Sequence, residues 1–89
     1  MVRLSKENIT DEIEVKVLEA FSAIHALGVR HNDVRGDNIL IGDGGSRVWI
    51  IDFEGSSLLA DYEDSDYGAP SEIDSVKRLF NAIKNGERW

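Results

Sequence analysis

The chain has 89 residues, 42% of them hydrophobic and 30% charged, with a formal net charge of −7. That length allows one compact domain or a part of a larger one. The absence of cysteine excludes disulfides and thiolate zinc sites, and the acidic balance argues against nucleic-acid or anionic-membrane partners. No apolar run approaches the roughly 20 residues of a membrane-spanning helix, and the N-terminus lacks the apolar core of a signal peptide. We therefore expect an intracellular, cytoplasmic protein.

The first predicted element is a helix over residues 11–27. Thr10 or Asp11 can cap its N-terminus, and Asp11 has capping-box spacing to Glu14. Gly28 can end it, because glycine adopts a left-handed backbone without strain. Apolar residues recur at three- and four-residue steps along one face, namely Ile13, Val17, Ala20, Phe21, Ile24 and Leu27.

A hairpin is predicted next, after a polar segment over residues 29–38. The β-branched runs Ile39–Ile41 and Val48–Ile51 favour strands. The glycine-rich segment 42–46 between them favours the positive φ angles of a hairpin loop. A two-stranded ribbon needs another element to cover it, and the helix over 11–27 is the candidate.

A second helix is predicted over Ser71–Asn85, after a loop from Glu54 to Ser71 that contains the acidic run 61–66. Ser71 would cap this helix, with Asp74 as a weaker capping-box partner, and Gly86 would end it. Its apolar stripe consists of Ile73, Val76, Leu79, Phe80 and Ile83. Two helices with a hairpin between them predict an α+β fold class.

The candidate functional residues are Asp33, Asn38 and Asp52. Asp33 and Asn38 lie five residues apart on the polar segment, and Asp52 follows the second strand. The hairpin reverses the chain between Asn38 and Asp52, so both can face one end of the ribbon. Two carboxylates and an amide oxygen around a common point suit Mg²⁺ that also binds substrate phosphates. Taken singly, each residue is better explained by turn formation.

At this point the sequence resembles the protein-kinase superfamily. His31-Asn32-Asp33-Val34-Arg35-Gly36-Asp37-Asn38 resembles the catalytic loop H-R-D-L-x-x-x-N, and Asp52-Phe53-Glu54 resembles the D-F-G motif that follows it. The similarity covers residues 12–55 and extends more loosely to the last helix. It implies that residues 1–89 form one partial kinase-like C-terminal lobe, with the catalytic-loop region at 29–55. Neither a Gly-rich nucleotide loop nor a V-A-I-K lysine is found, so we expect the N-terminal lobe to be absent.

The resemblance implies catalytic roles for four residues. Asp33 matches the catalytic aspartate, which accepts or orients the proton of the attacking hydroxyl. Arg35 falls where a cation offsets charge near the transferred phosphate. Asn38 and Asp52 match the residues that bind Mg²⁺ and, through it, the phosphates of ATP.

Three further residues would support the site. His31 and Phe53 match a pair that stacks in the core of kinases, and Asp74 matches an aspartate that steadies the backbone of the catalytic loop. Asn32 replaces the arginine that grips a phosphorylated activation loop, so control by loop phosphorylation is not expected. Glu54 replaces the glycine of D-F-G, a variant familiar from aminoglycoside and choline kinases.

These features lead to one hypothesis and two alternatives. The leading hypothesis is a fragment of a kinase-like enzyme, also similar to small fungal kinase-like proteins, that transfers phosphate from ATP to a protein hydroxyl with Mg²⁺. One alternative, suggested by Glu54, is a fragment of a small-molecule kinase. The other is a non-catalytic remnant or interaction module, which the missing nucleotide roof suggests. The acceptor is unknown, and exposed apolar surface is expected to favour self-association.

Overall fold

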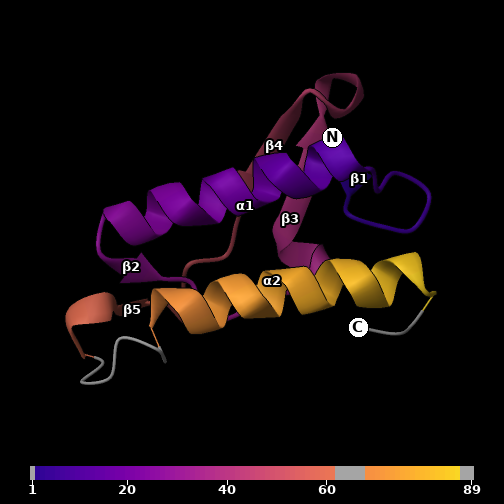
Figure 1. The fold of residues 1–89 in the computed structure, drawn as a ribbon. Helices are drawn as coiled ribbons and strands as arrows, with labels where there is room; N and C mark the ends of the chain where they lie inside the picture. Colours follow the sequence, from indigo (N-terminus) through magenta and orange to yellow (C-terminus); the bar gives the residue numbers. More distant parts are fainter. Residues whose placement is uncertain (1, 62–67, 87–89) are drawn as a thin grey trace.

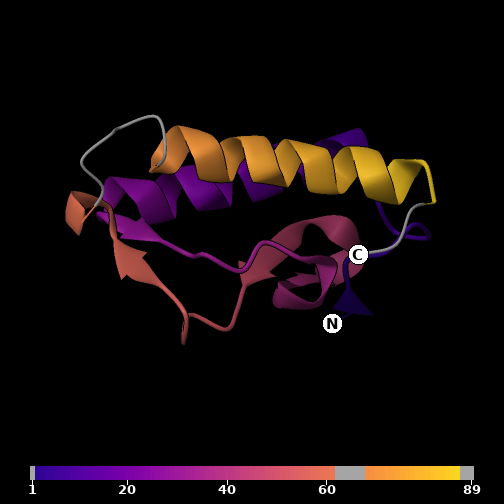
Figure 2. The ribbon, with the colours of Figure 1, turned by 90° about the horizontal axis from the view of Figure 1, so that it is seen from below.

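The computed structural model describes residues 2–61 and 68–86, which form an α+β fold. The elements in chain order are β1 (Val2–Arg3), α1 (Asp11–Ala26), β2 (Val29–Arg30), β3 (Ile39–Gly42), β4 (Arg47–Ile50), β5 (Ser57–Leu58) and α2 (Ala69–Lys84). Short 3₁₀ turns lie at Gly36–Asn38, Asp43–Gly45 and Leu59–Asp61. The two long helices lie side by side and run in opposite directions (Figure 1). They form one layer, and the strands and the polar segment form the other (Figure 2).

Helix α1 follows the prediction closely. Thr10 is its N-cap, and the Thr10 hydroxyl accepts a 3.1 Å hydrogen bond from the N–H of Ile13. The expected alternative cap, Asp11, is instead the first helical residue. Gly28 follows the helix with φ 83°, as a left-handed ending requires. The prediction that Leu27 belongs to the apolar face is wrong, because Leu27 lies beyond the last helical residue and is 83% exposed.

The strands form two small antiparallel sheets. The predicted hairpin is confirmed, since β3 pairs β4 with Ile39 opposite Ile50. β3 extends one residue further than predicted, and β4 lies one residue earlier. The two-residue strand β1 adds to the other edge of β3, with Val2 opposite Ile41. The second sheet joins β2 to β5, so the segment 54–71 that was predicted to be a loop includes a short strand.

Helix α2 begins two residues earlier than predicted. Gly68 is its N-cap and Pro70 lies in its first turn, where proline is favoured because its missing N–H has no helical partner. Ser71 therefore does not cap the helix, and its backbone carbonyl accepts a hydrogen bond from the Ser75 hydroxyl. Gly86 follows the helix with φ 73°, as predicted. Of the expected acidic loop run, residues 62–66 lie outside the described residues.

The core lies between the two layers. It is formed by buried residues of both helices, of β3 and of the segment after β1. These are Leu4, Ile13, Val17, Phe21, Ile39, Ile41, Val76, Leu79, Phe80 and Ile83. Burying this apolar surface is the main stabilising contribution to the fold. Helix α1 thus covers the hairpin as expected, because its buried face and β3 share one core.

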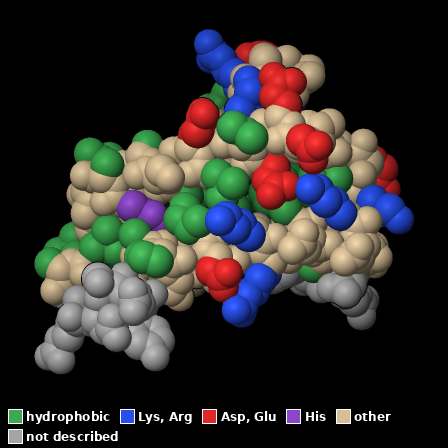
Figure 3. Space-filling view, viewed as in Figure 1, with side chains coloured by type: hydrophobic (Ala, Val, Ile, Leu, Met, Phe, Trp, Pro, Cys, Tyr) green, Lys and Arg blue, Asp and Glu red, His purple; other side chains and the backbone are tan. Residues whose placement is uncertain are grey.

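Charged and apolar side chains separate on the outer face of the helices. Apolar side chains gather where α1 ends and α2 begins, around histidine atoms that reach the surface, and charged side chains gather towards the other end (Figure 3). Among the described residues, no helix is long and apolar enough to cross a membrane.

Candidate active site

The candidate site is built on the loop over residues 31–38, which connects β2 to the 3₁₀ turn before β3. The loop is buried at both ends, because His31 is fully buried and the Asn38 side chain is almost so. Near its far end the loop passes close to β1: a β-carbon at Gly36 would lie only 3.0 Å from the carbonyl oxygen of Leu4. Glycine therefore fits at this position, because a β-carbon would crowd the backbone of Leu4.

Three of the predicted catalytic residues meet on this loop. The Asn38 amide nitrogen donates to the Asp33 carboxylate and to the Asp33 carbonyl, each at 2.9 Å. Arg35 Nε donates to the other Asp33 carboxylate oxygen, also at 2.9 Å. The hydrogen bond from Asn38 and, after it, the one from Arg35 hold the pKa of Asp33 below its ordinary value. Asp33 is therefore an oriented carboxylate at neutral pH, as a group that accepts a hydroxyl proton must be.

Asp52 is brought next to this group through the backbone. The N–H of Ile51 donates to the carbonyl of Asn38 at 2.9 Å, one step beyond the last β3–β4 pair. Asp52 follows with φ 63°, a left-handed conformation that aspartate adopts more readily than most residues. Backbone outliers of this kind often mark functional sites. The expectation that Asn38 and Asp52 share one end of the hairpin is thus confirmed for their backbones.

Asn38 and Asp52 have the chemistry of Mg²⁺ ligands. Asn38 directs its amide nitrogen towards Asp33, so its amide oxygen is the atom of this side chain with which a cation could interact. Asp52 is exposed, so its carboxylate is accessible, and hard oxygen ligands of this type are those Mg²⁺ prefers. Among the residues that the structure describes, no group of three or more His, Asp or Glu side chains is placed to hold a metal ion.

His31 joins the loop to the segment after β4. Its Nδ1 accepts from the N–H of Asp33 at 3.1 Å, and its Nε2 lies 2.6 Å from the carbonyl oxygen of Ile51. Because an N–H only donates and a carbonyl only accepts, this arrangement requires the proton on Nε2. The ring also meets Phe53 edge to face, with 4.8 Å between centroids. The structure therefore brings His31 and Phe53 together, as the resemblance implied.

The prediction that Asp74 steadies the loop backbone is wrong. It lies exposed on α2 and forms a 2.8 Å ion pair with Arg78. Glu72, one half-turn earlier and 1% exposed, occupies that place instead. Its carboxylate accepts from the N–H of His31 at 2.8 Å and from the N–H of Asn32 at 2.7 Å. The signal that could have found this residue is its spacing, because Glu72 lies four residues before Val76 and seven before Leu79, on the buried face of α2.

The carboxyl of Glu72 is kept ionised by its donors. Burial raises its pKa, but the Asn32 N–H, the His25 ring and the His31 N–H outweigh this effect. The pKa of Glu72 therefore lies below its ordinary value. A charged carboxylate holding two successive backbone N–H groups is a strong anchor, since hydrogen bonds to ionised acceptors are roughly twice as strong as neutral ones.

Asn32 is a second residue whose part the sequence did not reveal. It has φ 75°, and its side-chain amide donates to the carbonyl of Gly55 at 2.9 Å and to the Ser57 hydroxyl at 2.8 Å. Arg30, two residues before it, donates to the carbonyl of Gly68 at 3.2 Å. Where the kinase motif has arginine, this chain thus has a side chain that ties the loop to the segment around β5.

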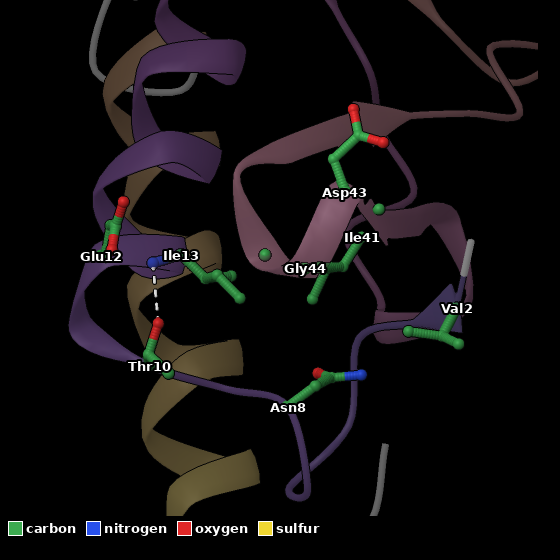
Figure 4. Close-up of a pocket in the computed structure, with 10 residues that line it drawn as sticks. Val2, Asn8, Thr10, Glu12, Ile13, Ile41, Asp43 and Gly44 are labelled. Carbon is green, nitrogen blue, oxygen red and sulfur yellow. Dashed lines mark hydrogen bonds between the residues drawn. The ribbon is translucent and has the colours of Figure 1, made fainter.

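Another cavity lies away from this loop. It measures about 480 Å³ and lies between the start of α1, the chain after β1 and the β3–β4 turn (Figure 4). Its polar side chains already have partners: Asn8 bonds the backbone of Ser5 and Arg3, and Thr10 caps α1. A smaller cavity of about 290 Å³ adjoins the loop. It is lined by Leu4, Ser5, Lys6, Arg35, Gly36, Asp37, Ile83 and Gly86.

Comparisons with known proteins point in one direction. The chain is 33% identical over 89 residues to the 3-deoxy-D-manno-octulosonic acid kinase of Vibrio vulnificus strain CMCP6, and equally to that of strain YJ016. Each match covers 97% of this chain and 35% of the relative, so the chain spans about a third of the length of these curated relatives. No protein-family model matches, and no solved structure does. These matches support a kinase-like relationship for the chain.

Proposed function

We propose that residues 1–89 form the catalytic-loop part of a kinase-like phosphotransferase that acts on a small molecule. The observation that carries this proposal is the hydrogen-bonded set of Asp33, Arg35 and Asn38, with the backbone of Asp52 brought to Asn38. Similarity to two sugar-acid kinases favours a small-molecule acceptor over the protein hydroxyl of the leading hypothesis. Glu54, in place of the glycine of D-F-G, fits the same choice.

Asp33 is the group that receives the proton. In the transfer, an acceptor hydroxyl oxygen forms a bond to the γ-phosphorus of ATP, and the bond from that phosphorus to the bridging oxygen breaks to release ADP. The hydroxyl proton passes to the Asp33 carboxylate, which Asn38 and Arg35 orient. The exposed guanidinium of Arg35 offsets negative charge on the transferred group. Asn38 and Asp52 would hold Mg²⁺, which neutralises charge on the phosphates when bound.

The acceptor would occupy the 290 Å³ cavity beside Arg35. This cavity has two cationic side chains, Lys6 and Arg35, and one carboxylate, Asp37. Cations at the mouth of a pocket suit a carboxylated sugar, because the carboxylate can pair with them. The class of acceptor proposed is therefore a sugar acid, as in the names of the matched relatives.

A turnover assay tests the proposal. ADP release is measured with Mg²⁺-ATP and 3-deoxy-D-manno-octulosonic acid for the 89-residue chain. Asp33→Asn is expected to lower the rate about a hundredfold or more. Asp43→Asn, exposed at the far turn of the hairpin and outside the proposed acceptor cavity, is the control and should retain activity. Equal rates for both variants would refute Asp33 as the base, and turnover of a protein acceptor but not of the sugar acid would refute the acceptor class.

Metal binding can be tested without turnover. Mn²⁺, used in place of Mg²⁺, broadens NMR signals close to its site. We expect broadening to be centred on the amides of Asn38 and Asp52 and to be lost in Asp52→Asn. The matched control is Asp43→Asn, at the far turn of the same hairpin. Broadening centred elsewhere, or unchanged in Asp52→Asn, would contradict the assignment.

The exposed apolar residues favour one second candidate, an interaction module. Ile51, Phe53 and Leu58 are 37%, 40% and 58% exposed, and large apolar patches often mark interfaces. Light scattering against concentration tests this candidate: Phe53→Ser should weaken any self-association, whereas a monomer at all concentrations would argue against association between copies.

A further inference from the structure

A buried histidine on α1 contacts the anchor of the 31–38 loop. His25 lies in the last turn of α1, and its side chain is 7% exposed. Its Nε2 lies 2.8 Å from Oε1 of Glu72, on α2. The pair is separated by 47 residues in the sequence. Neither the kinase motif nor the proposed chemistry assigns a part to His25.

The contact joins His25 to the loop through one carboxylate. Oε1 of Glu72 accepts from both His25 and the N–H of His31, and Oε2 accepts from the N–H of Asn32. An ionised carboxylate only accepts hydrogen bonds, so the Nε2 atom of His25 must carry a proton. With three donors in place, the carboxylate has little freedom to rotate away from the loop backbone.

The loop needs such an anchor because its backbone is strained. Asn32 has φ 75°, and a non-glycine residue in the left-handed region persists only where its surroundings hold it. The Asp33 that follows must keep its place for both Asn38 and Arg35 to reach its carboxylate. A shift of the 31–33 backbone would therefore move the group proposed to accept the proton.

Packing keeps the His25 ring in place. The ring of Phe21, one turn earlier on α1, lies 6.4 Å from that of His25 and 6.0 Å from that of His31. Phe21 is itself buried in the core. The orientation of His25 is thus set by the same aromatic ring that packs against the start of the loop.

We propose that His25 is a positioning residue for the 31–38 loop, acting through Glu72. It donates from Nε2 to the carboxylate and so holds the N–H groups of His31 and Asn32, and with them Asp33, in place. Its part in catalysis rests on the proposed function. NMR measures the protection of the loop amides directly and needs no turnover. The positioning role of His25 can therefore be refuted while phosphotransfer is confirmed, and phosphotransfer can be refuted while the positioning role is confirmed.

The first test uses the unaltered chain. Long-range ¹H–¹⁵N NMR correlations distinguish a histidine protonated on Nε2 from one protonated only on Nδ1. At neutral pH we expect His25 to carry a proton on Nε2, in either the neutral tautomer or the imidazolium. A neutral ring protonated only on Nδ1 would overturn the proposal, because Nε2 would then repel the carboxylate.

The second test compares two substitutions of His25. Gln can donate from a similar position, whereas Leu fills the space without a donor. Hydrogen exchange of the His31 and Asn32 amides should rise about tenfold or more in His25→Leu and stay near the original rate in His25→Gln. Equal rates in the two variants, or no rise in His25→Leu, would overturn the proposal.

A control separates loss of the anchor from a general loss of stability. Val17→Ala removes buried apolar volume from the same face of α1 without touching Glu72. Its exchange should rise throughout the core, and the ratio of His31 and Asn32 exchange to core exchange should stay unchanged. In His25→Leu that ratio should rise; a ratio equal to that of Val17→Ala would assign His25 a merely structural part.

Discussion

The two ends of the α1–α2 pair carry acid–base contacts of nearly equal length and opposite burial. At one end Lys84 Nζ lies 2.7 Å from Glu14 Oε1, with 39% and 24% of the side chains exposed. At the other, His25 Nε2 lies 2.8 Å from Glu72 Oε1, with 7% and 1% exposed. Water screens the first pair, and its loss costs little. The second leaves uncompensated buried groups when one partner is removed. The distance between the two atoms therefore does not show which of the two contacts contributes more to stability.

The difference extends to what each contact holds. Among the described residues, Lys84 contacts the acidic side chains of two α1 residues, Glu14 and, at 3.5 Å, Asp11. Glu72 also holds two backbone N–H groups of the candidate catalytic loop. The exposed end thus aligns two helices, whereas the buried end couples helix packing to the geometry of the site.

The largest expected effect comes from neutralising the buried end. Glu72→Gln keeps the shape but replaces one acceptor oxygen with an amide group that donates, so at least one buried donor loses its partner. We expect the free energy of unfolding to fall by about 3 kcal/mol, measured by urea denaturation. Glu14→Gln is the matched substitution at the exposed end. Similar losses for the two variants would contradict the ranking by burial.

A smaller effect is expected where the anchored backbone is strained. Asn32→Ala keeps a β-carbon at φ 75° and loses the bonds to Gly55 and Ser57. We expect a loss of about 1–2 kcal/mol in unfolding free energy. Asn32→Gly removes the same bonds but relieves the strain, so it should be less destabilising than Asn32→Ala. If Asn32→Gly were the worse of the two, strain at this position would not matter.

The two ends should respond to opposite extremes of pH. The pKa of Glu72 lies below its ordinary 4.5, chiefly because hydrogen bonds from Asn32, His25 and His31 overcome the effect of burial. Its contribution to stability is thus complete above pH 4.5 and lost as pH falls through the lower folded value. Asp33, whose pKa is also lowered, adds to the same acid loss.

Lys84 has the reverse dependence. Its hydrogen bond to Glu14 raises its pKa above the ordinary 10.5. Its contribution is complete below pH 10.5 and lost as pH rises through the higher folded value. Thermal melts from pH 2 to 12 measure both limbs. Glu72→Gln should reduce the fall in melting temperature at acid pH and leave the fall at alkaline pH unchanged. An unaltered fall at acid pH would contradict the assignment to Glu72.

The smallest effect is expected from removing the exposed cation. Lys84→Met should leave the urea midpoint almost unchanged at 0.15 M salt, because solvent-accessible ion pairs contribute about 1 kcal/mol or less. Repeating the measurement at low salt should reveal a slightly larger difference. A large loss at both salt concentrations would place the exposed end on a par with the buried one.

Local pattern was enough for the elements near the site. The periodicity over 11–27 located α1 within one residue of its end, and the β-branched runs on either side of the glycine-rich segment located the hairpin. Those signals are short-range, since they depend on side chains a few residues apart. They also placed Asn38 and Asp52 at one end of the hairpin.

Partners far apart in the sequence were not predictable in the same way. The strands β1 and β5 have two residues each, too few for any periodicity, and they exist only because β3 and β2 lie beside them. The wrong prediction of Asp74 in place of Glu72 also arose because the contact joins residues far apart in the sequence. Both are acidic residues in the first half of α2, and the packing of α2 against the loop decides which of them meets the loop backbone.

The sequence by itself determined the local chemistry of this protein: the spacing of Asp33 and Asn38, the hairpin that carries Asp52, and the apolar faces of two helices. Only the tertiary structure decided which carboxylate meets the 31–33 backbone and that His25 reaches it. Spacing along a chain determines which side chains share an element. Contacts across 40 or more residues depend on how the elements pack, because a rotation of one helix exchanges a buried carboxylate for an exposed one.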